Sequence, residues 1–89
     1  MEICCAVPDE GLSLKMNWEE SIIPSIGDAL YLTQFLNEED LLSLRMRKRK
    51  GETEDTLFDI LDDELLHVKD RSWLRNRDGK TYCLLILGY

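Results

Sequence analysis

Hydrophobic and polar residues alternate near the start of the chain, which is the pattern of a half-buried β-strand. The first run, residues 1–7, places its apolar side chains on one face at Ile3, Cys5 and Val7. A second run, residues 12–17, does the same at Leu12, Leu14 and Met16. The residues between the runs, 8–11, include a proline that fixes φ and a glycine that accepts a positive φ. The pattern therefore predicts a β-hairpin over residues 1–17.

The last part of the chain predicts a second hairpin. Alternation resumes at Leu65 and continues to Arg75, with a bulge expected at 70–72, and residues 76–79 end in a glycine suited to a tight turn. The final run, 80–87, is apolar on both faces, which is typical of a central strand. Residues 29–35 predict a further strand, the third in chain order.

Helical signals replace this alternation between the third and fourth strands. Asn37 is expected to cap a helix whose first turn holds three acidic residues, and Gly51 is expected to end it. The apolar stripe of this helix would be Leu41, Leu42, Leu44 and Met46. Leu42, Leu44 and Met46 also fit a strand, but the cap, dipole and stop signals agree on a helix. A second short helix is predicted around Glu54–Leu61, capped by Thr53.

These elements predict an α+β fold with about five strands. The sheet is expected to be small, curved and antiparallel, or to close into a five-stranded barrel, with one or two short helices inserted between strands three and four. A chain of 89 residues is long enough for one domain, so we expect a single globular domain over residues 1–89.

The composition bears on the cellular compartment in which the protein is expected. No apolar run approaches the roughly 18–20 residues that span a bilayer, so no membrane partner is expected. The N-terminal residues lack the basic and apolar regions of a signal peptide. Cys4 and Cys5 would point to opposite faces of a strand and, with Cys83, make an odd number of thiols. Reduced thiols in a cytoplasmic protein are therefore the preferred interpretation.

The net charge of −7 averages two very different parts. Five cations fall within six residues: Arg45, Arg47, Lys48, Arg49 and Lys50. They predict either a solvated helix end, which is the favoured interpretation, or a patch that contacts nucleic-acid phosphates. Residues 1–44 carry nine acidic residues and one basic residue. That excess fits ordinary solubility best, and otherwise an acidic face that imitates nucleic acid and binds a basic protein.

Metal binding and catalysis find little support in the pattern. The possible metal ligands are Cys4, Cys5, Cys83 and His67. Adjacent cysteines do not have the Cys-x₂₋₄-Cys spacing of zinc sites, so neither a metal nor a cofactor is expected. Cys83 lies in an apolar run, where a thiol is a buried small hydrophobe rather than a nucleophile. The sequence therefore predicts a protein that is not an enzyme.

One strand combines charge with an aromatic residue. Arg71, Trp73 and Arg75 alternate and so share a strand face. A core position is favoured for Trp73, and an exposed interface anchor is the alternative. The overall prediction is a small non-enzymatic protein–protein interaction module whose partner is another protein. The alternatives are a nucleic-acid-associated protein using residues 45–50, with help from Arg71, Arg75 and Arg77, or an acidic mimic of nucleic acid.

Overall fold

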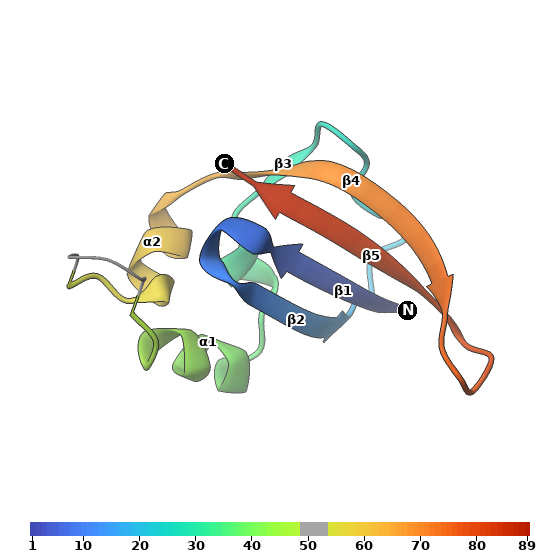
Figure 1. The fold of residues 1–89 in the computed structure, drawn as a ribbon, viewed down its shortest axis with the longest axis horizontal. Coiled ribbons are helices and arrows are strands. Elements are labelled where there is room, and N and C mark those ends of the chain that lie inside the picture. Colours follow the sequence, from blue (N-terminus) through green and yellow to red (C-terminus); the bar gives the residue numbers. More distant parts are fainter. Residues whose placement is uncertain (49–53) are drawn as a thin grey trace. The chain divides into compact units, whose positions relative to one another are not determined.

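A computed structural model describes residues 1–48 and 54–89 (Figure 1). It confirms the α+β class, with a curled five-stranded sheet in the order β2-β1-β5-β4-β3 and two short helices between β3 and β4. The strands are β1 (Glu2–Val7), β2 (Leu12–Asn17), β3 (Ala29–Leu30), β4 (Leu66–Arg75) and β5 (Thr81–Gly88). The helices are α1 (Glu38–Arg45) and α2 (Leu57–Asp63), with 3₁₀ turns η1 (Pro8–Glu10) and η2 (Leu32–Phe35).

The chain folds into two compact units. The first contains residues 1–28 and 67–88, and the second contains residues 29–66 with Tyr89. The expectation of one domain over residues 1–89 stays a prediction. None of the helices in the described ranges is long and apolar enough to cross a membrane.

The first unit begins with the predicted hairpin. β1 and β2 pair antiparallel from Glu2 opposite Asn17 to Val7 opposite Leu12. Gly11 ends the turn at φ 61°, in the left-handed region that glycine adopts without strain. The side chains expected to face inward on β1 are buried: Ile3, Cys5 and Val7.

β5 has a neighbour on both sides, as its two apolar faces predict. It pairs antiparallel with β4 and parallel with β1, so the sheet is mixed rather than wholly antiparallel. The alternation of side chains fixes which face each residue occupies but not the direction of the neighbouring strand, which is why the parallel pair was missed. On the inner face of β5, Cys83, Leu85 and Leu87 are at most 1% exposed.

β4 contains the predicted bulge, one residue earlier than expected. Val68 pairs with Leu87 and Asp70 with Ile86, so Lys69 is the extra residue. Bulges bend a strand and increase its twist, and β4 curves strongly along its length in Figure 1. The second hairpin closes at Gly79, which has a φ of 80°.

The second unit corrects the predicted third strand. Only Ala29 and Leu30 are extended, and the chain then forms the 3₁₀ turn η2. Leu32 and Thr33 are both buried although they are adjacent, which a strand with one buried face cannot achieve. The Thr33 hydroxyl donates to Asp62 Oδ1 of α2 at 3.0 Å.

The helices form where the sequence places them, with shifted ends. Asn37 caps α1 by accepting from the Asp40 amide, as predicted. The helix ends at Arg45, and Gly51, its expected stop, lies outside the described residues. Most of the expected apolar stripe is not buried. Only Leu44 is fully covered, whereas Leu42 and Met46 are 57% and 80% exposed.

The second helix starts later than predicted. Its cap is Thr56, which forms a reciprocal capping box with Asp59, whereas the expected cap, Thr53, lies outside the described residues. The spacing predicts one apolar face of Leu57, Phe58, Ile60 and Leu61; the helix buries three of these residues, and Phe58 is only partly buried.

Candidate functional site

Residues 70–75 of β4 form the most unusual surface of the first unit. Arg71 pairs with Leu85 and Trp73 with Cys83, so both side chains lie on the same sheet face as the buried residues of β5. Even so, Trp73 is 50% exposed, which makes the favoured core position wrong for this residue. Arg75 is also exposed, and Arg71 is half-buried. The inner face of the sheet is therefore open at Trp73 and Arg75, although the same face is covered at Val68.

The hairpin turn shows which backbone groups of β4 point away from β5. The Asn76 amide donates to the Lys80 carbonyl at 2.9 Å, so the backbone of Asn76 faces across the hairpin. Backbone groups alternate in direction along a strand, so Leu74 and Ser72 also face β5. The amide and carbonyl groups of Trp73 and Arg75 consequently point to the outer edge of the sheet.

Another segment of the chain, residues 24–28, covers the outer edge of β4 from Val68 to Arg71. Val68 donates to the Asp28 carbonyl at 2.8 Å and accepts from the Gly27 amide at 2.9 Å. Arg71 Nη1 lies 3.2 Å from Ser25 Oγ and 3.4 Å from the Pro24 carbonyl, and donates to both. The segment 24–28 therefore lies beside β4 as far as Arg71.

Beyond Arg71 this cover stops. The Arg71 amide is satisfied by Asp70 Oδ1 at 2.8 Å, a side chain acting where a neighbouring strand would. For Trp73 and Arg75, no other segment of the first unit supplies a hydrogen bond to the outward backbone groups. The outer edge of β4 at these two residues is hereafter the open edge.

The opposite edge strand, β2, differs in its side chains. Its exposed residues are all polar: Ser13, Lys15 and Asn17. A short edge with polar side chains and a lysine is the usual protection against unwanted strand pairing. The open edge instead carries an exposed tryptophan and, at Leu74, a side chain that is 39% exposed. Large exposed apolar residues beside unpaired backbone groups mark a surface suited to another strand.

The charge around the open edge is opposite to that of the whole chain. Residues 69–80 contain five basic and two acidic residues, a net charge of +3 within a protein of −7. The exposed cations near the open edge are Arg75, Arg77 and Lys80. Because salt screens charges beyond about 8 Å under physiological conditions, a ligand on this edge would respond mainly to the local positive charge.

The described residues of the basic run, Arg45, Arg47 and Lys48, lie at and just after the end of α1. Arg45 is in the last turn of α1 and its guanidinium lies over the Phe58 ring, 4.2 Å from the ring centre. Arg47 and Lys48 follow the helix and pair with the start of α2, where the Leu57 amide donates to the Arg47 carbonyl at 2.8 Å. Arg49 and Lys50 lie outside the described residues. Contact of this run with nucleic acid stays a prediction.

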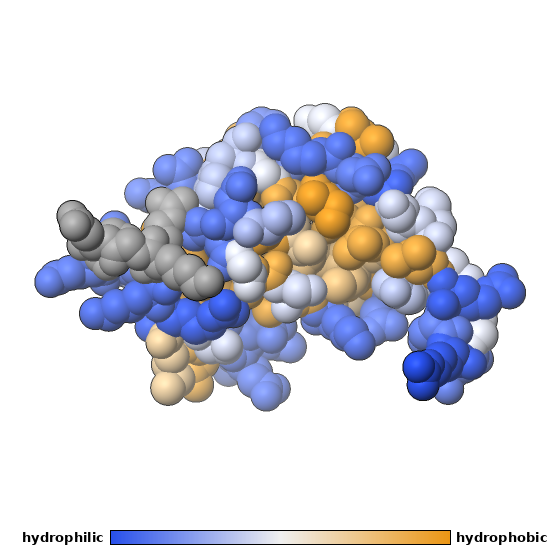
Figure 2. All heavy atoms as spheres, viewed as in Figure 1, coloured by the Kyte–Doolittle hydropathy of each residue, from blue (hydrophilic) through white to orange (hydrophobic). Residues whose placement is uncertain are grey.

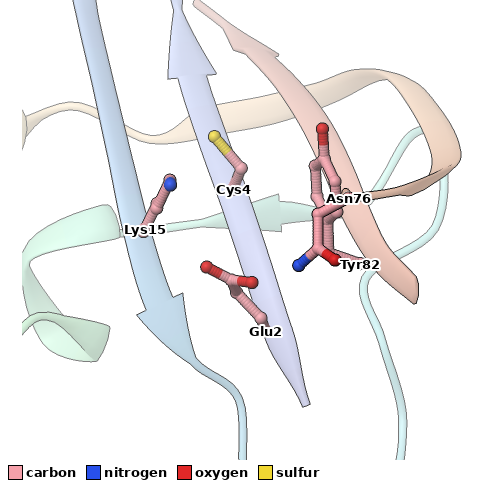
Figure 3. A pocket seen from close by; sticks show the side chains of 5 residues that line it. All are labelled: Glu2, Cys4, Lys15, Asn76 and Tyr82. Carbon is pink, nitrogen blue, oxygen red and sulfur yellow. The ribbon is translucent and has the colours of Figure 1, made fainter. Parts of the chain in front are cut away.

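The outer face of the sheet, opposite the core, carries a second surface. Figure 2 shows hydrophobic side chains gathered over β1 and β5. The outward, partly exposed residues of those strands are Cys4, Ala6, Tyr82, Leu84 and Ile86. At one end of this surface is a pocket of about 210 Å³, lined by Glu2, Cys4, Lys15, Asn76 and Tyr82 (Figure 3). Pockets for small ligands usually measure about 300–1,000 Å³, so this one is small for such a role.

The cysteines lie on the predicted faces. Cys4 is partly exposed, with its sulfur 3.5 Å from Ser13 Oγ, whereas Cys5 and Cys83 are buried. Burial raises the pKa of Cys5 to about 12, and the neighbouring thiols of Cys4 and Cys83 act in the same direction. Burial also raises the pKa of Cys83, an effect that the positive charge of Arg71 partly opposes. Among the described residues, no group of three metal-ligating side chains lies together.

The open edge contains two of the residues singled out in the sequence, Trp73 and Arg75, and Arg71 lies next to it on the same sheet face. Sequence reasoning missed the backbone groups beside them, because a strand's neighbours cannot be read from its own residues. Asp70 is a usable signal in the sequence, because its short acidic side chain can accept a hydrogen bond from the next backbone amide, which then needs no neighbouring strand. The chain matches no known family model, and no curated protein or solved structure is significantly similar to it.

Proposed function

We propose that this protein is a non-enzymatic interaction module that binds an extended segment of another protein along the open edge of β4. The observation that carries the proposal is the outward-facing backbone of Trp73 and Arg75, which has no neighbouring strand within the first unit. An added strand would continue the sheet through main-chain hydrogen bonds, a common mode of peptide recognition.

The side chains around the open edge support this mode of binding. Tryptophan and arginine are the residues most often found to dominate binding energy at protein interfaces. Trp73 is held at the edge of the inner sheet face by its pairing with Cys83, so an arriving strand would cover its exposed half. The proposal includes an intracellular setting, which the three free cysteines support.

The first experiment asks whether linear peptides bind and whether they bind as a strand. A displayed library of random linear peptides is selected on the protein, and the enriched peptides are made with single N-methyl groups at successive positions. An added strand points alternate amides toward the sheet, so N-methylation should weaken binding at least tenfold at every second position only. A selection that enriches nothing, or losses without a two-residue period, would contradict strand addition.

A matched pair of variants tests the same point from the protein side. Arg75→Ala removes the charge, and Arg75→Pro removes the charge together with the outward amide. Proline is tolerated in edge strands when its missing N–H faces solvent, so the β4–β5 ladder should remain. We expect Arg75→Pro to bind the selected peptides at least tenfold more weakly than Arg75→Ala. Amide NMR spectra check that both variants are folded; if Arg75→Pro is not, the N-methyl series decides alone.

A further inference from the structure

We infer that the segment bound at the open edge is acidic, with a carboxylate two positions away from an apolar residue. This inference rests on the proposed function and specifies its partner. It is supported by the positions of two side chains on one sheet face at the open edge: Trp73 and Arg75.

The geometry of an added strand assigns its side chains to the two faces of the sheet. A residue directly opposite Trp73 would lie on the same face as the indole, and a residue two positions away from it would lie opposite Arg75. The edge at Arg71 is already covered by the segment 24–28. Cross-strand pairs of opposite charge stabilise a sheet, whereas like charges destabilise it. An apolar residue opposite Trp73, with glutamate or aspartate two positions away, therefore suits both Trp73 and Arg75. Because the direction of the added strand is not fixed, a carboxylate on either side of the apolar residue can reach Arg75.

The two arginines are not equivalent. Arg71 Nη1 already donates to Ser25 and Pro24, which holds its side chain beside the segment 24–28. Arg75 is exposed and has no ion-pair partner in the described part of the chain, so it is the cation with which an arriving carboxylate can pair. The net charge of +3 over residues 69–80 adds attraction from the same side.

The same side chains argue against a second copy of this protein as the occupant. If two open edges paired antiparallel around Trp73, Arg71 of each copy would lie opposite Arg75 of the other. Two such like-charge pairs would oppose the association. An acidic partner removes that repulsion, and this is why we assign the edge to a different protein.

The test compares synthetic probes of equal length in fluorescence anisotropy at 0.15 M salt. The first nine-residue probe has a central valine with glutamates two positions before and after it, and threonine elsewhere. The second probe has lysines in place of the glutamates, and the third has the two glutamates moved next to each other. We expect the first probe to bind at least tenfold more tightly than either of the others.

Charge reversal on the protein gives the matched control. Arg75→Glu should weaken binding of the glutamate probe at least tenfold and strengthen binding of the lysine probe. Lys15→Glu, an equal charge change on the opposite edge strand β2, should change binding of both probes less than threefold.

Each other outcome counts against the inference in a different way. Equal binding of glutamate and lysine probes, with the two-residue N-methyl pattern intact, would overturn the acidic partner and leave strand addition standing. Loss of the N-methyl pattern would overturn the proposed function itself. Tighter binding of a single-stranded oligonucleotide, abolished by Arg75→Glu, would assign the basic edge to nucleic acid. A concentration-dependent dimer abolished by Arg75→Pro, in sedimentation velocity, would assign it to a second copy.

Discussion

Trp73 of β4 lies directly opposite Cys83 of β5, yet Cys83 is completely buried and Trp73 is half exposed. Paired residues on one sheet face normally share their environment, because their Cβ atoms are only about 4.5–5.5 Å apart. The boundary of the core therefore runs between these two strands. At Trp73, β4 lies just outside that boundary, whereas Leu66 and Val68 of the same strand are buried inside it.

The first prediction uses this boundary. Trp73→Ala should lower the free energy of unfolding by only about 1 kcal/mol, because half of the indole is already in water. Leu85→Ala, on the same face of β5 and 1% exposed, should cost about 2–5 kcal/mol through loss of packing and a new cavity. Urea unfolding followed by circular dichroism measures both. Equal losses would show that Trp73 is a core residue and would remove it from the open edge.

The second prediction concerns the β4–β5 turn. Asn76 Oδ1 accepts from the amides of Asp78 and Lys80, each at 3.0 Å. Asn76→Ala removes both acceptors at once and should cost about 1–2 kcal/mol of stability. Asn76→Asp keeps an acceptor at the same place and serves as the control in the same thermal unfolding measurement. If the alanine variant were no less stable than the aspartate variant, the side chain would not hold the turn.

The third prediction is a pH dependence from Cys5. Its pKa is raised from 9.0 to about 12 in the folded protein, so the thiolate is disfavoured by folding. The stabilising effect is complete below pH 9 and is lost as the pH rises from there toward 12. In urea unfolding with reductant present, stability should fall over this range more steeply for the wild type than for Cys5→Ala.

Cys4 supplies the matched control for that measurement. It is the adjacent residue, is partly exposed and lies on the opposite sheet face, so Cys4→Ala should keep most of the wild-type slope. A Cys5→Ala variant with the full wild-type slope between pH 9 and 11 would show that this thiol is not the group responsible.

The fourth prediction asks which cations of the basic run contribute to stability. Arg45 lies over the Phe58 ring, a contact worth about 0.5–1 kcal/mol at an exposed site. Arg45→Ala should therefore destabilise the protein by about that amount, whereas Lys48→Ala should change stability by less than about 0.5 kcal/mol. A double-mutant cycle with Phe58→Leu isolates the contact. No coupling between the two positions would mean that Arg45 is available for other partners.

The sequence predicted best where one face of a strand is buried and the other is not. Alternation located the first hairpin, and two apolar faces identified the last strand as central. It failed at Leu32 and Thr33, because two adjacent buried residues follow from contact with α2, which local periodicity does not encode. It also placed the end of α1 too late, since pairing of Arg47 with the start of α2 stops the helix first.

The candidate site was predicted only in part. The alternation of Arg71, Trp73 and Arg75 correctly put them on one face, but it did not show that this was the inner face. Nor could it show where the cover by residues 24–28 ends, because that depends on contacts across more than forty positions in the chain, such as Arg71 with Pro24. The pattern of side chains along a strand predicts which sheet face each residue occupies. Which strand edges stay unpaired depends on long-range topology, which that pattern does not encode.

The parallel pairing of β1 with β5 has a consequence for how this protein is made. Ile3 pairs with Cys83 and Ala6 with Ile86, so the middle of the sheet joins segments about 80 positions apart. At roughly 5–20 residues per second, β1 is synthesised about 4–16 s before its central neighbour exists. Hairpins form in microseconds, so the nascent β1–β2 hairpin has time to form and to present the inner edge of β1 to other chains. The growing chain, more than the finished protein, is the state in which mispairing of strands is to be expected.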